Sequence, residues 1–423
     1  MSISKRNFLT ASGLTMLGLA AGCKSEAAKA TPPKTAANGL KNLTKAAPKI
    51  TKSDHRARLE KAQSLMQAQG ISALFLDVGP SLQYFTGVRW WRSERLTAAI
   101  IPVEGEICVV TPHFEEPSIR ESLRVKADIR TWNEDENPFQ RVVGFLQDKG
   151  INSGKIAIED TVRFFAVDGI QQVSGAYDLV NGTGIVWGCR MYKSAKELAL
   201  MQIATDITIA AYRHTYPQIE VGMRPSDIRQ IMSEATEALG GENDFVLVLL
   251  NEASAYPHGS GTPQKVKEGG IVLMDCGASV NGYKSDISRT FVMGEPTKRQ
   301  REVWNLVRDG QAKAFETAHI GTPAGKVDDA VRALYEANGF GPGYQLPGLP
   351  HRTGHGIGME GHEKINFVHG EATPLAAGMC LSNEPGLYIM GEFGVRLEDC
   401  LYMTKDGPKY FSTPPTSIEN PMG

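Results

Sequence analysis

Residues 272–286 read VLMDCGASVNGYKSD and contain the clearest structural signal in the chain. Ile271 and the first three residues of this stretch form a continuously apolar run, which is typical of a buried strand. The dipeptide Asn281-Gly282 is the strongest short signal for a hairpin with a two-residue turn. The stretch therefore predicts two antiparallel strands in which Val280 pairs with Tyr283.

Two aspartates lie on this hairpin. The predicted register places Asp275 opposite Ser288 and Gly277 opposite Asp286, so the aspartates are diagonal neighbours on one face, about 7–8 Å apart at the backbone. We expect Gly277 to leave the space between them free of side chains. An ionised carboxylate at the end of a buried strand costs free energy unless it is paired or bound to metal. The hairpin therefore predicts a cation site; the alternative is a pair of solvent-facing aspartates.

Three further motifs towards the C-terminus contain candidate ligands. They are HRTGHGIG with His355, SNEPG with Glu384, and GVRLED with Glu398. The glycines around His355 are expected to let the backbone come close to a bound ion. In the last motif, alternation places Arg396 and Glu398 on one face of a strand, so Arg396 is expected to orient that carboxylate.

Together these motifs resemble those of the pita-bread metallopeptidases, a clan that includes methionine aminopeptidase, prolidase, Xaa-Pro aminopeptidase and creatinase. The resemblance covers about residues 55–410. It implies two divalent ions that share a bridging hydroxide. Four carboxylates and one imidazole form a hard, oxygen-rich ligand set, which favours Mn²⁺, with Co²⁺ or Zn²⁺ as alternatives. Four negative charges in one cleft would repel one another unless cations lay among them.

The resemblance also implies how the ligands are shared between the ions. Asp275 and Glu398 bridge both ions, Asp286 binds one of them, and His355 and Glu384 bind the other. The sequence therefore carries a complete candidate ligand set.

Catalytic and substrate-binding roles follow from the same resemblance. Glu384 is the expected proton shuttle, and His258 and His362 match the two histidines that steady the substrate and the tetrahedral intermediate. His351 and Arg396 match residues that bind substrate. The implied activity is hydrolysis of Xaa-Pro bonds at peptide N-termini, of the aminopeptidase P or the prolidase type. Trp90-Trp91 is either part of a proline pocket, in this or a neighbouring subunit, or ordinary packing.

Two other functions remain as alternatives. One is a pita-bread enzyme of different chemistry, such as a creatinase-like amidinohydrolase or a lyase. The other is a catalytically silent binding protein of the cell envelope. The complete ligand set argues against the first, and the retained candidate catalytic residues argue against the second.

The pattern of helices and strands predicts an α/β chain of the α+β type with two domains. Residues 51–187 alternate helix and strand signals, beginning with a helix from Ser53 to Gly70, and match a smaller creatinase-type N-terminal domain. Residues 188–418 contain two capping boxes about 100 residues apart, Ser194 with Glu197 and Thr297 with Gln300. Each box opens a pair of helices followed by strands. We therefore expect two related halves with pseudo-twofold symmetry, and the resemblance implies that they form a pita-bread domain.

The N-terminus predicts export. Lys5 and Arg6 precede an apolar stretch at residues 8–21, as in a signal peptide, which we assign to residues 1–30. This segment resembles a twin-arginine signal with one arginine replaced by lysine. Residues 19–23 resemble a lipobox, so lipid attachment at Cys23 is the alternative to simple cleavage. Residues 31–50 read as a flexible linker. The expected location is the periplasm or cell envelope.

Composition restricts the partners. The formal net charge is −2, and basic residues are interleaved with acidic ones, so a nucleic acid partner is not expected. The six cysteines form no CxxC pair, which argues against a structural zinc site. The expected partners are a peptide with proline at its second position and, by resemblance, a second copy of the chain in a homodimer.

Overall fold

The computed structural model describes residues 39–423. The predicted signal peptide, Cys23 and the first part of the predicted linker lie outside the described residues. The prediction of a flexible linker is wrong for residues 39–50. The backbone N–H of Leu43 donates to the carbonyl of Leu239 at 2.8 Å, and Leu40 and Ile50 pack against the core. Scattered apolar residues in a stretch rich in alanine, lysine and threonine are enough to bind it to the protein surface. Within residues 39–423, no helix combines the length and the apolar character needed to cross a bilayer.

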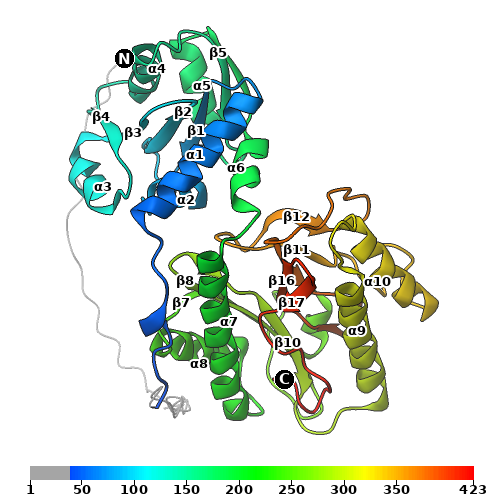
Figure 1. The fold of residues 1–423 in the computed structure, drawn as a ribbon. Helices are drawn as coiled ribbons and strands as arrows, with labels where there is room; N and C mark the ends of the chain where they lie inside the picture. Colours follow the sequence, from blue (N-terminus) through cyan, green and yellow to red (C-terminus); the bar gives the residue numbers. More distant parts are fainter. Residues whose placement is uncertain (1–38) are drawn as a thin grey trace, which may run out of the picture. The chain divides into compact units, whose positions relative to one another are not determined.

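The N-terminal domain is a mixed sheet of six strands with helices packed against it (Figure 1). The strands lie in the order β4-β3-β2-β1-β5-β6. Their bounds are β1 (Ala73–Asp77), β2 (Ala98–Pro102), β3 (Ile107–Pro112), β4 (Ala127–Trp132), β5 (Gly154–Ile158) and β6 (Tyr177–Asn181). The helices are α1 (Lys52–Ala68), α2 (Pro80–Thr86), α3 (Glu116–Ser122), α4 (Pro138–Asp148), α5 (Phe164–Val173) and α6 (Thr183–Arg190). The predicted domain boundary after residue 187 lies inside α6.

Helix α1 begins earlier than predicted. Its N-cap is Thr51, whose side chain accepts a hydrogen bond from the N–H of Asp54, while the Asp54 carboxylate accepts one from the N–H of Thr51. This reciprocal capping box satisfies two helix donors, so it outcompetes Ser53, where the helix was expected to start.

The first half of the second domain begins with the two helices α7 (Ala195–Thr215) and α8 (Pro225–Ala238). The predicted Ser194–Glu197 capping box at the start of α7 is confirmed. The strands that follow are β7 (Glu242–Leu250), β8 (Ile271–Val280), β9 (Tyr283–Lys284) and β10 (Ile287–Val292). They form a sheet in the order β10-β8-β7, with β9 paired to β8.

The second half repeats this order of helices and strands. Its helices are α9 (Lys298–Thr317), which begins at the predicted Thr297–Gln300 capping box, and α10 (Gly325–Ala337). Its strands are β11 (Gly354–Gly356), β12 (Glu363–Phe367), β13 (Cys380–Asn383), β14 (Gly386–Ile389), β15 (Phe393–Arg396), β16 (Asp399–Thr404) and β17 (Gly407–Tyr410). Five of them form the sheet β12-β11-β13-β16-β17. The predicted pair of related halves is therefore confirmed.

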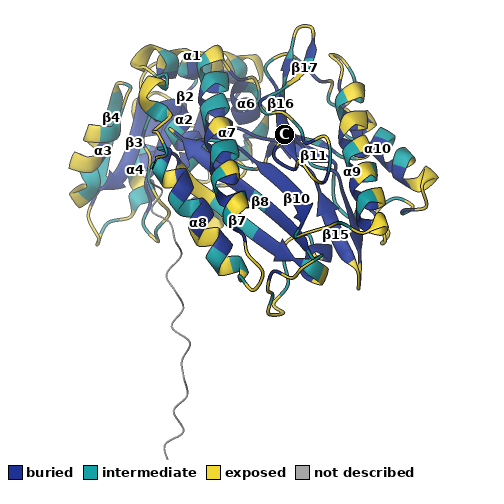
Figure 2. Ribbon diagram, turned by 90° about the horizontal axis from the view of Figure 1, so that it is seen from below, coloured by how far each residue is buried: buried dark blue, intermediate teal, exposed yellow. Residues whose placement is uncertain are grey.

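The central strands of the second domain are shielded from solvent. Strands β8 and β10 are buried along almost their whole length, whereas α8 and α10 keep exposed faces (Figure 2). The five cysteines among residues 39–423 are buried and free. The polar residues that remain inside this core must satisfy one another, which draws attention to the carboxylates between the two sheets.

Candidate metal centre

The first two predicted ligands lie on the hairpin as expected. Val280 pairs with Tyr283, and Asp275 pairs with Ser288, so the predicted register is confirmed. The prediction for Gly277 is wrong. A Cβ atom there would lie 2.5 Å from the ring of Phe245 on β7, so the glycine makes room for this ring rather than for an open ion site.

His355 is the central residue of β11, which lies close to the strands β12 and β13 on either side. A Cβ atom on Gly354 would lie 2.1 Å from the carbonyl oxygen of Ser382, and one on Gly356 would lie 2.4 Å from that of Lys364. The glycines therefore let β11 fit between β12 and β13, which corrects the expectation that they admit an ion. Ser382 also fixes the site, because its hydroxyl accepts from the His355 N–H at 2.9 Å.

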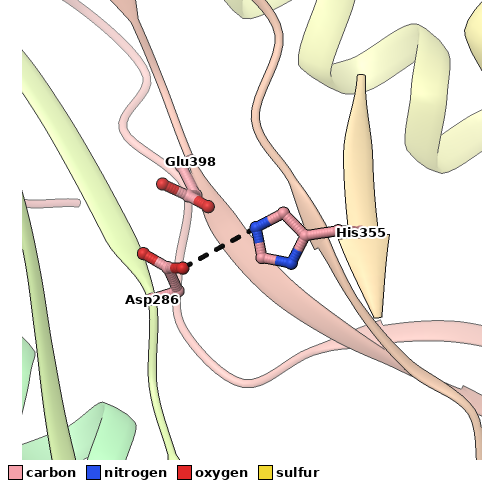
Figure 3. Close-up of side chains that lie close together, drawn as sticks. All are labelled: Asp286, His355 and Glu398. Carbon is pink, nitrogen blue, oxygen red and sulfur yellow. Dashed lines mark ion pairs between the residues drawn. The ribbon is translucent and has the colours of Figure 1, made fainter. Parts of the chain in front are cut away.

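The remaining two carboxylates lie at the ends of β13, the neighbour of β11, and of β16, the next strand of the sheet. Glu384 directly follows β13, and Glu398 directly precedes β16. The nearest oxygen of Glu384 lies 3.1 Å from Nε2 of His355, and that of Asp286 lies 3.8 Å from the same nitrogen. One ligand atom each from Asp286, His355 and Glu398 lie within 4.8 Å of one another, and the two carboxylates face the imidazole (Figure 3).

Two buried oxygens of this cluster lack a hydrogen-bond partner, namely Asp275 Oδ1 and Glu398 Oε1. Burial, together with the nearby carboxylates of Asp275 and Glu384, raises the pKa of Asp286 well above its ordinary value. Burial and the Asp286 carboxylate do the same to the pKa of Glu398. Buried, mutually repelling oxygens with free lone pairs are what divalent cations neutralise, so the residues present fit a metal centre.

Glu384 differs from the other carboxylates. Burial alone would raise its pKa, but the charge of His355 and a hydrogen bond from it lower the pKa to about 2. Its Oε1 also accepts from the Ser382 hydroxyl at 3.2 Å. Glu384 therefore stays ionised more readily than Asp286 or Glu398.

Arg396 orients a different carboxylate from the one predicted. Its Nη2 donates to Asp275 Oδ2 at 2.7 Å, and its Nε donates to the Ser288 hydroxyl at 2.9 Å. That hydroxyl in turn donates to Glu398 Oε2 at 2.8 Å. The reason is a break in the strand after Arg396, so this residue and Glu398 are no longer neighbours on one face. Sequence alternation had no signal for Ser288.

Three further histidines face the same cavity, which has a volume of about 540 Å³ and includes all five predicted ligands. These are His258, His351 and His362. The His362 ring packs edge-on to that of His355, with centroids 4.2 Å apart, and His351 Nε2 lies 2.9 Å from the hydroxyl of Tyr388. Burial lowers the pKa of both His351 and His362 to about 4. Tyr388, which also accepts from Arg396, is a site residue that the sequence did not reveal.

The two tryptophans lie elsewhere. Trp90 and Trp91 stack on each other with ring centroids 4.9 Å apart, and Trp91 is 70% exposed. Among the residues that the structure describes, those lining the cavity come from residues 244–398 and do not include this pair. Within one chain, the tryptophans therefore do not form a proline pocket.

Comparisons with known proteins agree with this architecture. The family model of the creatinase/prolidase N-terminal domain matches residues 58–192, and that of metallopeptidase family M24 matches residues 199–405. An uncharacterized peptidase of Schizosaccharomyces pombe is 31% identical over 366 residues, which cover 81% of this chain and 78% of the relative. A Xaa-Pro dipeptidase of Pyrococcus furiosus is 27% identical over 357 residues, which cover 84% of this chain and 97% of the relative.

Solved structures give the same result. The dipeptidase PepE from Mycobacterium ulcerans matches with a TM-score of 0.80 and 28% identity, and the match covers 88% of this chain and 98% of that protein. The similarity thus extends over both domains and includes the strands that carry the acidic cluster. On these grounds the chain belongs to metallopeptidase family M24 and is a metal-dependent peptidase.

Proposed function

We propose that the protein hydrolyses Xaa-Pro bonds at peptide N-termini. The observation that carries the proposal is the convergence of five candidate ligands, drawn from both halves of the domain, on one cavity of about 540 Å³. These ligands are Asp275, Asp286, His355, Glu384 and Glu398. The relative from Pyrococcus furiosus, a Xaa-Pro dipeptidase, supports proline as the second residue of the substrate.

Two divalent ions bound by these residues would polarise the scissile carbonyl and lower the pKa of a bound water. The side chains around them supply the proton transfers. Glu384 faces the cavity as an ionised carboxylate, so it accepts the proton of the attacking water and delivers it to the leaving nitrogen. His258 and His362 line the cavity, and by the family resemblance they would donate hydrogen bonds to the oxygen of the tetrahedral intermediate.

A preference for proline is compatible with the lining of the cavity. A prolyl bond lacks an N–H, so it is recognised by the shape of the ring rather than by a hydrogen bond to nitrogen. Phe245, Leu247 and Pro257 give the cavity an apolar wall beside the acidic cluster. Such a wall favours a compact apolar ring over an extended polar side chain.

Manganese is our proposal for the native metal, since hard oxygen ligands outnumber the single imidazole. Cobalt and zinc are the alternatives. Protein stripped of metal and reloaded with one ion at a time, then compared for turnover and thermal stability, distinguishes the three. The highest turnover with zinc or cobalt would contradict the choice of manganese.

The test of function uses Mn²⁺-loaded protein and three peptides: Ala-Pro, Ala-Pro-Ala and the control Ala-Ala. Hydrolysis of Ala-Pro alone identifies a prolidase, and release of alanine from Ala-Pro-Ala alone identifies an aminopeptidase. Faster cleavage of Ala-Ala than of the prolyl peptides would contradict the proline preference. Absence of any cleavage would favour a creatinase-like amidinohydrolase or a lyase on the same fold, which the complete ligand set currently disfavours.

Export and assembly are separate proposals. The N-terminal sequence supports a location in the periplasm or cell envelope, and the resemblance to prolidases supports a homodimer. Cell fractionation of the full chain and of Cys23→Ala tests lipid attachment, because only an anchored protein is released by the substitution. Light scattering on purified protein tests the dimer, and a monomeric mass would refute it.

A further inference from the structure

We propose that Glu363 is a positioning residue for His362, and that the N-terminal domain contributes to catalysis through the buried charges that hold Glu363. The inference rests on the proposed function, because it concerns a histidine that lines the cavity and is a candidate catalytic residue. It adds residues from outside the metal cluster and from the other domain.

Glu363 is held by two cations in an almost closed environment. Its carboxylate accepts from Arg190 Nη2 at 2.6 Å and from Lys193 Nζ at 2.8 Å. The three side chains are only 1–2% exposed. Arg190 is the last residue of α6, and Lys193 lies in the short link that leads to α7. Removing one partner from such a network leaves a buried charge uncompensated, so the network strongly restrains its members.

The same carboxylate shapes the loop that carries His362. Glu363 Oε1 accepts from the backbone N–H of Met359 at 3.0 Å and from that of Glu360 at 3.3 Å. A Cβ atom on Gly358 would lie 2.7 Å from the Glu363 carboxylate, so the loop closes tightly around it. His362, the adjacent residue, is thereby held edge-on to His355 at the wall of the cavity.

The network continues into the N-terminal domain. Arg190 Nη1 donates to the hydroxyl of Ser81, at the start of α2, at 2.8 Å. Ser81 in turn donates to Glu159, which follows β5, at 2.9 Å. A continuous chain of buried hydrogen bonds thus connects the sheet of the N-terminal domain with the loop of His362. Apolar packing could also hold the two domains together. Hydrogen bonds are directional, so they additionally fix the orientation of the loop that carries His362.

The test compares two Glu→Gln variants at buried contacts between the domains. Glu363→Gln removes the proposed positioning charge. Glu197→Gln is the matched control, because Glu197 of α7 is 4% exposed and accepts from Arg58 of α1 at 3.0 Å, yet it does not line the cavity. Both variants are expected to lower the melting temperature. At a temperature where both remain folded, only Glu363→Gln should lower kcat, by roughly 10-fold to 100-fold with little change in KM, since one oxyanion-type donor is worth about 10²–10³ in rate.

A double variant and a measurement without substrate complete the test. In a His362→Ala background, Glu363→Gln should cause no further loss of kcat, because the residue acts through that histidine. In metal-free protein, hydrogen exchange at the amides of Met359 and Glu360 should accelerate in Glu363→Gln and stay unchanged in Glu197→Gln. Lys193→Met leaves Arg190 in place and should lower kcat in the same way, but by a smaller factor. It replaces Glu363→Gln in the test if that variant does not fold.

Two results would overturn the inference: a kcat for Glu363→Gln within twofold of the unsubstituted protein, or kcat losses that multiply in the double variant. If the unsubstituted protein cleaves no Xaa-Pro peptide, the proposed function fails. The exchange rates at residues 359 and 360 would still decide whether Glu363 positions the loop.

Discussion

Asp286→Asn should stabilise the metal-free protein while weakening its response to metal. In the structure, ligand atoms of Asp286 and Glu398 lie within 4.8 Å of each other, and the pKa of each carboxyl group is raised well above its ordinary value by burial and by its acidic neighbours. Two unit charges at this distance repel each other by about 3 kcal/mol at an effective dielectric constant of about 20. Replacing one of them by a neutral amide should recover up to about 3 kcal/mol of folding free energy at neutral pH.

The pH dependence gives the sign of this effect. Because the pKa of Asp286 is raised in the folded protein, the native state binds more protons than the unfolded state between the ordinary and the raised value. The metal-free protein therefore recovers the stability lost at Asp286 as the pH falls through the raised pKa. The advantage of Asp286→Asn over the unsubstituted protein should shrink over the same range.

Divalent ions should reverse the order of stability. Ligand that binds only the native state adds about 2.7 kcal/mol at a concentration 100 times its Kd. Asp286→Asn lacks one ligand to the ions, so its gain at the same Mn²⁺ concentration should be smaller. The assay is thermal unfolding of both proteins in EDTA and in MnCl₂. The control is Asp178→Asn, which replaces an exposed aspartate on β6 and should change neither the stability in EDTA nor the gain in MnCl₂. The reasoning would be refuted if Asp286→Asn were less stable than the unsubstituted protein in EDTA and gained as much stability from Mn²⁺.

Three other predictions concern residues around the cluster. Glu384→Gln should lower kcat by about 10²–10⁴, the usual contribution of a general base, and leave the melting temperature of metal-free protein within a few degrees; near-normal turnover in a peptide assay would reject the assignment. Arg396→Lys keeps the charge but cannot bond both Asp275 and Ser288, so metal affinity or kcat should fall about 10-fold to 100-fold, as seen by metal titration and kinetics. Because the pKa of His351 is lowered to about 4, its neutral form contributes folding stability above pH 6.5, and roughly 3 kcal/mol of this is lost as the pH falls towards 4. His351→Gln should therefore flatten the dependence of the unfolding free energy on pH in this range. An unchanged pH dependence would count against a buried neutral imidazole.

Local signals in the sequence predicted much of the fold. The Asn281-Gly282 turn determines the strand register through its length alone, so Asp275 was placed opposite Ser288 correctly. The capping boxes at Ser194 and Thr297 mark helix starts because their hydrogen bonds are made within four residues. Signals of this kind depend on neighbours in the chain and are legible without the tertiary structure.

The remaining errors concern contacts between distant segments. Gly277 makes room for Phe245, which belongs to another strand, and Gly354 makes room for the backbone at Ser382. Arg396 bonds to Asp275, 121 residues earlier in the chain, and not to the nearby Glu398. No periodicity reports such pairings. The five candidate ligands that line one cavity were identified directly by motif resemblance, whereas the bonds that orient them were not predicted.

These long-range bonds also explain how the metal centre holds its shape between the two halves of the domain. Strand β10 acts as the junction: fully buried Arg289 pairs with Asp399 at 2.7 Å and donates to the carbonyl of Glu398 at 2.8 Å, and the Thr290 hydroxyl donates to the carbonyl of Arg396 at 2.8 Å. Glu398 and Asp399 of the second half are therefore fixed to β10 by protein groups alone. Metal binding is then not required to bring the two halves together. The free energy of metal binding instead offsets the repulsion between the carboxylates of the cluster. We therefore expect a centre organised in this way to remain folded in EDTA, the state in which removal of one repelling carboxylate can be measured.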